Sequence, residues 1–343
     1  MRNSVLWAIC LLTIVSMFIA VFIFTRSAFC NYFYLDESTG FIGDTIGGIT
    51  SPIVGLASII LLCYTLKKQQ EFEQRQLAQM REEKFEATLF NLLAQQRAIR
   101  NELVESFHTL SKNNVCKKID GKAQGLDFFA MARYELYWLF RAFNDGATYN
   151  DYNETGAEAY MQSIYDEISY GPSHSEGITK EDKKILDNAK HDVMSSFYAN
   201  MFNITESDIK IYNQKSDFEK VKYVYSKYYL HRQDSGHYFR HLYRILSFIE
   251  QSEEKEMRFN QNVAQIRKNY TQYAQFIQSQ MTRNEMLLLF YNIFCFPKAL
   301  KLVERYGILE NLRLDYLLFP EHNCIPQIKL KQGLKEQQMS SFH

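Results

Sequence analysis

The chain has 343 residues and no formal net charge at pH 7, because 39 basic side chains balance 39 acidic ones, so the whole surface has no charge excess that favours non-specific nucleic-acid binding. The six cysteines form no CxxC motif, which argues against a zinc ribbon and against a disulfide scaffold. Glycine (14) and proline (5) are scarce while phenylalanine (26) and tyrosine (23) are abundant, and this composition predicts a mainly α-helical protein with long elements.

Two apolar stretches near the N-terminus are long enough to cross a membrane. Residues 5–25 and 46–66 contain no charged side chain, and a bilayer core needs about 20 helical residues. The first stretch is longer than the apolar part of an ordinary signal peptide, about 7–15 residues, and no convincing small-x-small cleavage site follows it. The sequence therefore predicts a membrane hairpin over residues 1–66, with a short outer loop.

Basic residues set the predicted orientation of this hairpin. Arg2 precedes the first stretch and Lys67 and Lys68 follow the second, whereas the loop over 26–45 is mainly acidic. The positive-inside rule then places both termini in the cytoplasm and the short loop outside. The rest of the chain, from residue 67 onward, is predicted to be cytoplasmic.

Small residues recur every four positions around the start of the second stretch, at Gly43, Gly47, Ser51 and Gly55. They share one helix face, and such a face lets another transmembrane helix approach closely. Asp44 lies at the outer end, where it either caps the helix N-terminus or forms a ring of acids at the mouth of an oligomeric pore. Both interpretations stay open: a hairpin packed within one chain, and a pore whose helices meet along this face.

A long helix is predicted over residues 67–110, because apolar residues recur there at helical spacing without glycine or proline. A cytoplasmic helical domain over 111–326 follows, and the basic, polar tail over 327–343 is predicted to be loosely ordered. Thr282 and Glu285 have the spacing of a capping box, which gives Glu285 a structural role. The domain has loop clusters at 144–156 and 171–177 and helical patterns at 126–140, 157–168, 278–294 and 296–312.

The densest group of chemically active side chains lies in GHYFRHLYRILSFIE, residues 236–250. On a helix, His237, Arg240, His241 and Arg244 form one cationic stripe beside an apolar one. The two histidines have metal-ligand spacing, but no acid or cysteine stands beside them, so no metal site is predicted. The stripe either pairs with acids of a neighbouring helix or binds an anionic partner.

Arg232 and His237 also fit the R-x4-6-H spacing of HEPN ribonucleases, in which arginine and histidine serve phosphodiester cleavage. With eight histidines, about one such spacing is expected by chance. No Walker loop, GxGxxG, GxSxG or HExxH motif occurs. We therefore predict no catalytic residue, no metal and no cofactor, with a membrane-tethered ribonuclease that uses Arg232 and His237 as the alternative.

Five stretches carry a family resemblance through their order along the chain: GDTIGGITSP at 43–52, YTLKKQQEF at 64–72, FEATLFNLL at 85–93, HYFRHLYRIL at 237–246 and NEMLLLFYN at 284–292. Together they resemble the putative phage abortive infection proteins, a bacterial group with two N-terminal spans and a helical cytoplasmic domain. The resemblance extends over most of residues 41–312 and is weakest through 111–235.

The resemblance implies an effector of anti-phage defence in the bacterial inner membrane, which damages that membrane and kills the infected cell once triggered. Some members are encoded beside a retron reverse transcriptase and its RNA–DNA hybrid, so such a complex is an implied silencing or sensing partner. Membrane lipid and further copies of the chain are the other expected partners. A plainer alternative is a non-catalytic membrane scaffold that recruits other proteins.

Overall fold

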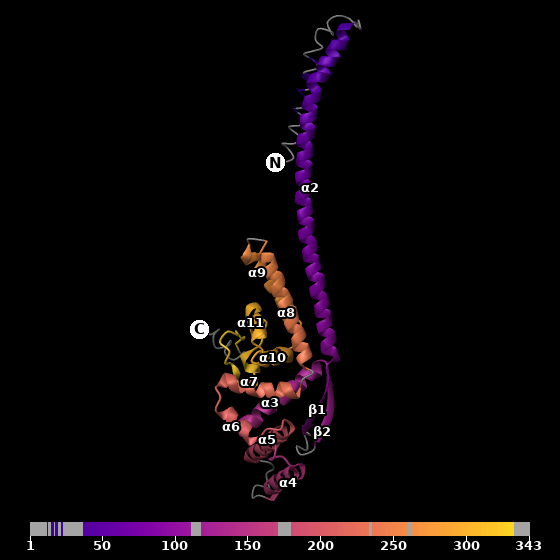
Figure 1. The fold of residues 1–343 in the computed structure, drawn as a ribbon. Coiled ribbons are helices and arrows are strands. Elements are labelled where there is room, and N and C mark those ends of the chain that lie inside the picture. Colours follow the sequence, from indigo (N-terminus) through magenta and orange to yellow (C-terminus); the bar gives the residue numbers. More distant parts are fainter. Residues whose placement is uncertain are drawn as a thin grey trace. The chain divides into compact units, whose positions relative to one another are not determined.

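The computed structural model describes residues 37–110, 118–170, 180–232, 235–259 and 262–332, together with positions 12, 15, 16, 18, 19 and 22. The chain divides into two compact units, Met1–Glu86 and Ala87–His343. Ten α-helices account for most of the described residues, so the predicted mainly α-helical fold is confirmed (Figure 1).

The elements follow one another along the chain in a simple order. The helix α2 (Glu37–Glu102) is followed by a hairpin of two strands, and a series of nine further helices then completes the described fold. The strands, helices and short 3₁₀ turns (η) are β1 (Val104–Leu110), β2 (Lys118–Gln124), α3 (Leu126–Asp145), α4 (Glu154–Tyr170), α5 (Lys180–Met201), α6 (Glu206–Asn213), α7 (Asp217–His231), α8 (Ser235–Met257), α9 (Val263–Ser279), α10 (Arg283–Asn292), α11 (Pro297–Tyr306), η1 (Leu314–Tyr316) and η2 (Pro320–His322).

One helix in the described part of the chain is long and apolar enough to cross a membrane. The candidate segment is Thr50–Glu102 of α2, and none of its most apolar window is buried within the protein. This window belongs to the second predicted stretch, 46–66, whose length and composition fit a span. The first predicted stretch, 5–25, lies outside the described residues except at six positions, which are helical. Of the predicted outer loop over 26–45, residues 26–36 also lie outside the described part, whereas residues 37–45 form the start of α2, so the loop prediction was wrong there.

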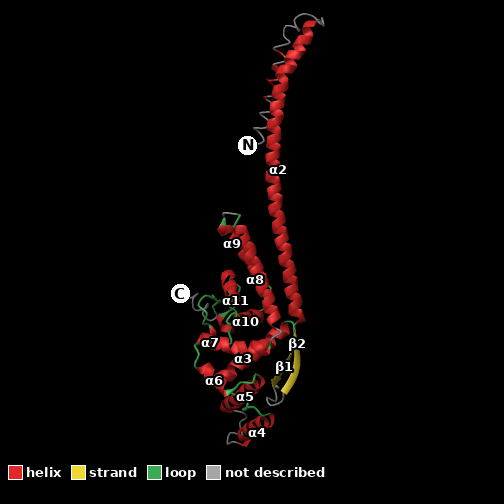
Figure 2. Cartoon of the chain, in the orientation of Figure 1, coloured by secondary structure: helices red, strands yellow, loops and turns green. Residues whose placement is uncertain are grey.

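The long helix ends earlier than predicted. Instead of continuing to residue 110, α2 stops at Glu102, and Val104–Leu110 forms β1, which pairs antiparallel with β2 (Figure 2). Leu103 and Phe107 are both buried. Their spacing of four fits one turn of a helix and also two alternations of a strand, so periodicity could not separate the two structures. The helix prediction was wrong for residues 104–110.

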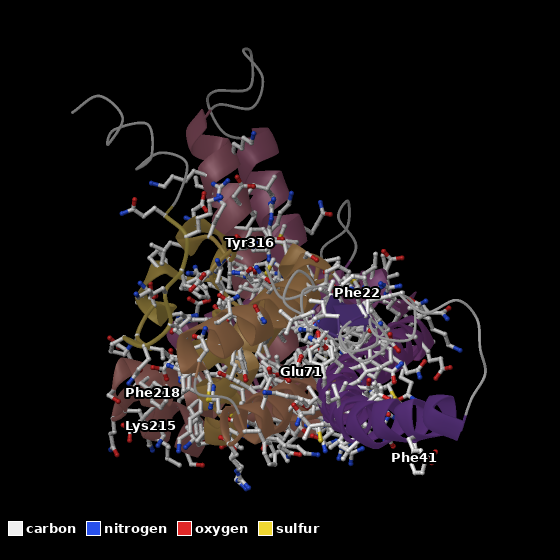
Figure 3. All side chains as sticks on the ribbon, turned by 90° about the horizontal axis from the view of Figure 1, so that it is seen from above. Phe22, Phe41, Glu71, Lys215, Phe218 and Tyr316 are labelled. Carbon is white, nitrogen blue, oxygen red and sulfur yellow. The ribbon has the colours of Figure 1, made fainter. Side chains whose placement is uncertain are left out.

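The helix α3 forms the centre of the second unit. It packs against α5, α7, α10 and the hairpin, and Phe128, Phe129 and Phe140 are among its fully buried side chains. Side chains fill the spaces between the helices of this unit (Figure 3). The helices predicted over 126–140 and 157–168 are confirmed as parts of α3 and α4, whereas the loop cluster at 171–177 lies outside the described residues.

Two predicted C-terminal helices are shorter than expected, for local reasons. The pattern over 278–294 is divided between α9 and α10, and the capping box that starts α10 is confirmed because Thr282 Oγ1 accepts from the Glu285 N–H at 3.3 Å. The helix predicted over 296–312 ends at Tyr306, since Gly307 takes the left-handed conformation, with φ of 62°, that stops a helix.

The C-terminal segment is tied onto the helical core. Arg133 donates to the Tyr316 hydroxyl at 2.8 Å, and that hydroxyl donates to Asn284 Oδ1 at 2.8 Å; Tyr316 is labelled in Figure 3. The backbone of Lys331 also bonds to Leu312 and Leu314, at 2.9 Å each. The beginning of the predicted loose tail is therefore attached to the unit, while residues 333–343 lie outside the described part.

Candidate functional site

Residues 236–250 lie on α8, as their pattern predicted, and the apolar stripe of this helix faces the core. Phe239, Leu242, Leu246 and Ile249 are all buried. Their burial anchors α8 on the unit, since each apolar side chain of this size contributes about 1.5–3 kcal/mol when it is removed from water. The two helix faces therefore have different environments, which decides what each cation of α8 can contact.

His241 leaves the predicted cationic stripe and belongs to the contact between α8 and the end of α2. Its Nδ1 lies 2.7 Å from Gln96 Oε1 and its Nε2 lies 3.4 Å from Gln95 Oε1. Burial lowers the pKa of His241, which favours the neutral ring. A buried, neutral and hydrogen-bonded histidine offers no charge to an external anion, so the prediction of four cationic donors on one surface was wrong at this position.

The other three residues of the stripe, His237, Arg240 and Arg244, are exposed. Arg240 Nε donates to the Gly236 carbonyl of its own helix at 3.2 Å. Neither Arg240 nor Arg244 forms an ion pair with any carboxylate in the part of the chain that the structure describes. We call these three side chains the α8 surface; an internal ion pair does not account for them, and the anionic-partner hypothesis remains a prediction.

A face of α8 adjacent to the α8 surface contacts the end of α2. Gln96 Nε2 donates to the Tyr238 carbonyl at 3.4 Å, while the same amide contacts His241 through its oxygen. The Tyr238 hydroxyl donates to Glu285 Oε1 of α10 at 2.7 Å. One turn of α8 thus connects the last turns of α2 to α10.

Two arginines of α2 complete this connection. Arg97 Nε and Nη2 both donate to Gln280 Oε1, at 3.1 and 2.9 Å, and Arg100 Nη1 lies 3.7 Å from the buried carboxylate of Glu285. With Gln96 and Tyr238 these side chains line a small cavity. We call this group the α2 junction; because its contacts reach α8, α10 and the residue that ends α9, a shift in those helices changes the environment of the end of α2.

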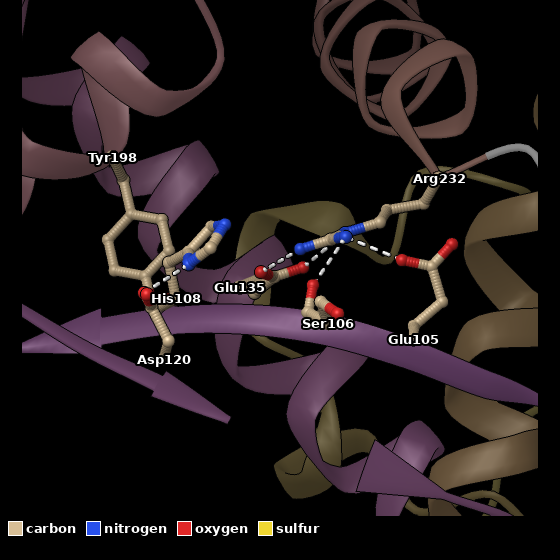
Figure 4. A network of polar contacts seen from close by, with 7 residues as sticks. All are labelled: Glu105, Ser106, His108, Asp120, Glu135, Tyr198 and Arg232. Atoms are coloured by element: carbon tan, nitrogen blue, oxygen red, sulfur yellow. Dashed lines mark hydrogen bonds and ion pairs between the residues drawn. The ribbon is translucent and has the colours of Figure 1, made fainter. Parts of the chain in front are cut away.

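Arg232, the residue of the ribonuclease alternative, is buried in an ion-pair network at the end of α7 (Figure 4). Its Nη2 and Nε donate to the two oxygens of Glu135 at 2.6 and 3.0 Å. Its Nη1 donates to Glu105 at 2.5 Å and to the Ser106 carbonyl at 2.9 Å, and the guanidinium lies over the ring of Phe107. The network joins the hairpin, α3 and α7.

The charges of this network leave Arg232 no free donor face for a substrate. Burial raises the pKa of Glu135 to about 7, and the guanidinium of Arg232 opposes that shift. Two carboxylates and a carbonyl take four hydrogen bonds of a group that has five N–H donors. In the described part of the chain no hydrogen bond joins His237 to the network, and the structure gives Arg232 a structural role.

The residues predicted for membrane packing lie in α2. Gly47, Ser51 and Gly55 are exposed, and a Cβ placed at Gly47 or Gly55 meets no atom within 4 Å. Gly43 and Asp44 lie in the same helix, which begins at Glu37. Asp44 is therefore two turns inside α2, and the prediction that it caps the N-terminus was wrong.

Among the described residues, no group of three or more His, Cys, Asp or Glu side chains has the geometry to hold a metal ion. Comparison with known families gave one finding. Residues 230–316 match the family described as putative phage abortive infection protein. The predicted resemblance is confirmed over this segment, which contains the motifs at 237–246 and 284–292. The comparisons with curated proteins and with solved structures gave no match.

The segment that matches the phage abortive infection family extends from the end of α7 to η1. It contains Arg232, the α8 surface, and the α8, α9 and α10 side of the α2 junction. The family segment thus includes side chains that contact the last turns of α2.

Sequence reasoning missed the partners in both polar groups. Glu135 lies on the apolar face of the helical pattern LDFFAMARYELYWLF, whose other acid, Asp127, is in the first turn, and an acid on an apolar face signals a buried ion pair. Gln96 and Gln280 gave no comparable signal, because glutamines on a polar helix face are normally solvated. Only the packing of α2 against α8 and α9 reveals their roles.

Proposed function

We propose that the chain is a membrane effector of bacterial anti-phage abortive-infection defence, which breaches the inner membrane and kills the infected cell once triggered. One observation carries this proposal: the segment that matches the abortive infection family occurs in the same chain as a helix that is long and apolar enough to span a bilayer. A defence protein that acts at the membrane needs both parts.

In this proposal the chain is a multi-pass protein with both termini in the cytoplasm, and several copies assemble through the second span. The positive residues that flank the apolar stretches support the orientation. The exposed small residues Gly47, Ser51 and Gly55 support the assembly, since they leave room for a neighbouring helix to approach closely.

The α8 surface is proposed to receive the trigger. His237, Arg240 and Arg244 suit an anionic partner, such as the phosphates of an RNA–DNA hybrid held by a reverse transcriptase. Tyr238 and His241 lie on the same helix and contact the end of α2. A partner that moves α8 would change the α2 junction, and no catalytic residue is needed for that step.

Single substitutions that enlarge one side chain of the second span test the assembly step. Gly47→Leu and Gly55→Leu insert bulk on the proposed packing face, so killing after phage infection should fall at least tenfold while membrane insertion persists. Ile60→Phe is the control: it adds bulk to the same helix at an exposed position about 140° around the axis from both Gly47 and Gly55. Equal killing by all three variants would exclude this face as the working interface.

A further inference from the structure

The hairpin has two outer edges, and the described residues cover only the edge on the β1 side. On the β1 side, the Ser106 carbonyl accepts a hydrogen bond from Arg232, and the His108 carbonyl accepts one from the Tyr198 hydroxyl at 3.2 Å. Figure 4 shows both side chains beside this strand. Side chains from α7 and α5 thus occupy backbone groups that a further strand would need.

Within the described part of the chain, no hydrogen bond reaches the outer edge of β2. In the observed register Phe107 faces Gly121 and Glu105 faces Ala123, and Gly125 N donates to Leu103 O at 3.0 Å. In an antiparallel pair, every second residue points both its N–H and its C=O toward the partner strand, and in β2 these residues include Gly121 and Ala123. The N–H and C=O groups of the intervening residues therefore point away from β1, and those residues are exposed: Lys118, Asp120, Lys122 and Gln124.

We propose that a second copy of this chain pairs with the open edge of β2, antiparallel, about a two-fold axis at Gly121. In this register the whole strand Lys118–Gln124 pairs with itself, because Lys118 lies opposite Gln124 of the other copy. All residues whose backbone groups point outward are then hydrogen-bonded across the interface. Figure 2 shows the two strands at the edge of the helical unit.

The charges of β2 select the same register. Asp120 of each copy lies opposite Lys122 of the other, which gives two attractive pairs, each of the kind that contributes about 0.2–1 kcal/mol. Lys122 forms no ion pair within the described part of its own chain, and Asp120 uses Oδ1 for His108 at 2.7 Å, which leaves Oδ2. A slip by one residue in each strand, to an axis at Asp120, would place Asp120 opposite Asp120 and Lys118 opposite Lys122.

The geometry also explains why the occupant is one further copy and not an open series of strands. Pairing about a two-fold axis uses the same surface on both chains and closes after two. The outer edges of the resulting four-stranded sheet are the two β1 strands, whose carbonyls Arg232 and Tyr198 already occupy. Exposed strand edges promote uncontrolled association, and this arrangement leaves none open.

A disulfide across the axis tests the pairing. In a non-hydrogen-bonded antiparallel pair the Cα atoms are about 4.5 Å apart, within the disulfide range, so Gly121→Cys should cross-link to its own copy. A Cβ at Gly121 meets no atom within 4 Å. The experiment uses the full chain in membranes with its six native cysteines changed to serine. Lys118→Cys is the matched control, since its copy lies about 20 Å away and should not cross-link.

A charge exchange makes the test specific. Lys122→Glu and Asp120→Lys, each added to Gly121→Cys, should each lower the cross-linked fraction on the order of tenfold, because each places like charges opposite twice. Co-expressed with different tags, the two variants should cross-link with each other, since attraction is restored in the mixed pair. Both changes are exposed and should leave membrane accumulation unchanged.

Cross-linking of Lys118→Cys as strong as that of Gly121→Cys, or no effect of the charge variants, would overturn the proposal. If Gly121→Cys fails to accumulate, co-purification of differently tagged copies replaces the cross-linking. Loss of co-purification with Lys122→Glu would support the pairing, and unchanged co-purification would overturn it. The measurement requires no phage and no killing, so it stands or falls separately from the proposed function.

Discussion

At the scale of single residues, burial decides whether a charged side chain is available for chemistry. Arg232 lies at a spacing that fits a nuclease motif, yet it is 6% exposed and bonds to Glu135 and Glu105. His237, five positions later, is exposed on α8. The same sequence motif thus places one residue in the core and one on the surface, and only the partners distinguish a structural arginine from a catalytic one.

Replacement of Arg232 tests that role. Arg232→Ala leaves two carboxylates without their cation, one of them fully buried, and should cost about 3–5 kcal/mol in the free energy of unfolding. Arg232→Lys keeps the charge but loses the paired hydrogen bonds, so an intermediate loss is expected. Denaturant unfolding in detergent provides the measurement, with the exposed Arg240→Ala as control. Equal stability of Arg232→Ala and Arg240→Ala would contradict the structural role.

His322 gives the folded unit a predictable response to acid. Its ring is buried against Phe140 and its Nδ1 lies 2.8 Å from the Tyr291 hydroxyl. Burial lowers the pKa of His322 to about 3, so the unfolded chain takes up a proton below about pH 6.5 while the folded chain does not. Its contribution to stability is full above pH 6.5 and falls with pH, by about 2 kcal/mol between pH 7 and pH 5.

His322→Phe should therefore remove about 2 kcal/mol of the wild-type pH dependence over this interval, because phenylalanine does not titrate and suits the aromatic surroundings. Tyr291→Phe, the control, removes the hydroxyl partner and keeps the imidazole, so it should lower stability while the pH dependence persists. Unfolding at both pH values measures the difference. A His322→Phe profile parallel to that of the wild type would show that another group dominates.

At the scale of elements, α8 has one face for the fold and one for a partner. Arg244→Glu reverses a charge that no described carboxylate neutralises, so the variant should accumulate and fold normally. Under the partner hypothesis it loses association with the silencing partner, by at least tenfold, and becomes inert or constitutively toxic. Pull-down of the partner measures this, with Lys255→Glu on the same helix as control. Normal pull-down and a normal phage response would exclude the α8 surface as the receptor.

Local patterns predicted several elements but not their ends. Periodicity over 126–140 predicted most of α3, and the Thr282–Glu285 spacing predicted the start of α10. The β-hairpin was missed because Leu103 and Phe107 satisfy helical and strand periods alike. The stop of α11 at Gly307 and the division between α9 and α10 depend on backbone conformation at single residues, which a periodicity over many residues does not resolve.

The partners of Arg232 and His241 could not be predicted from the sequence, for a different reason. The contact of Arg232 with Glu135 joins residues that are distant along the chain, and the contact of His241 with Gln96 does the same. One helix pattern cannot say which residues of another helix face it. The cationic stripe of α8 was correctly placed on one helix, and its division into a buried and an exposed part follows only from the position of α2.

At the scale of the whole molecule, the chain combines a membrane-length apolar segment with a helical unit that carries the family match. The α2 junction and the α8 surface lie on adjacent faces of one helix within that unit. This arrangement supports an effector in which recognition and membrane action are separate in sequence and connected through α8. A ribonuclease that uses Arg232 and His237 would need Arg232 free beside His237, whereas Arg232 is bonded to Glu135 and Glu105.

The most direct test follows the membrane potential of infected cells that carry the chain with its neighbouring genes, alongside the integrity of their RNA. We expect depolarisation to precede RNA loss in wild-type cells and in Ile60→Phe cells, and to be absent in Gly47→Leu cells, because only the last variant adds bulk to the packing face. RNA cleavage while the potential holds, abolished by His237→Ala, would contradict a membrane effector and establish the ribonuclease.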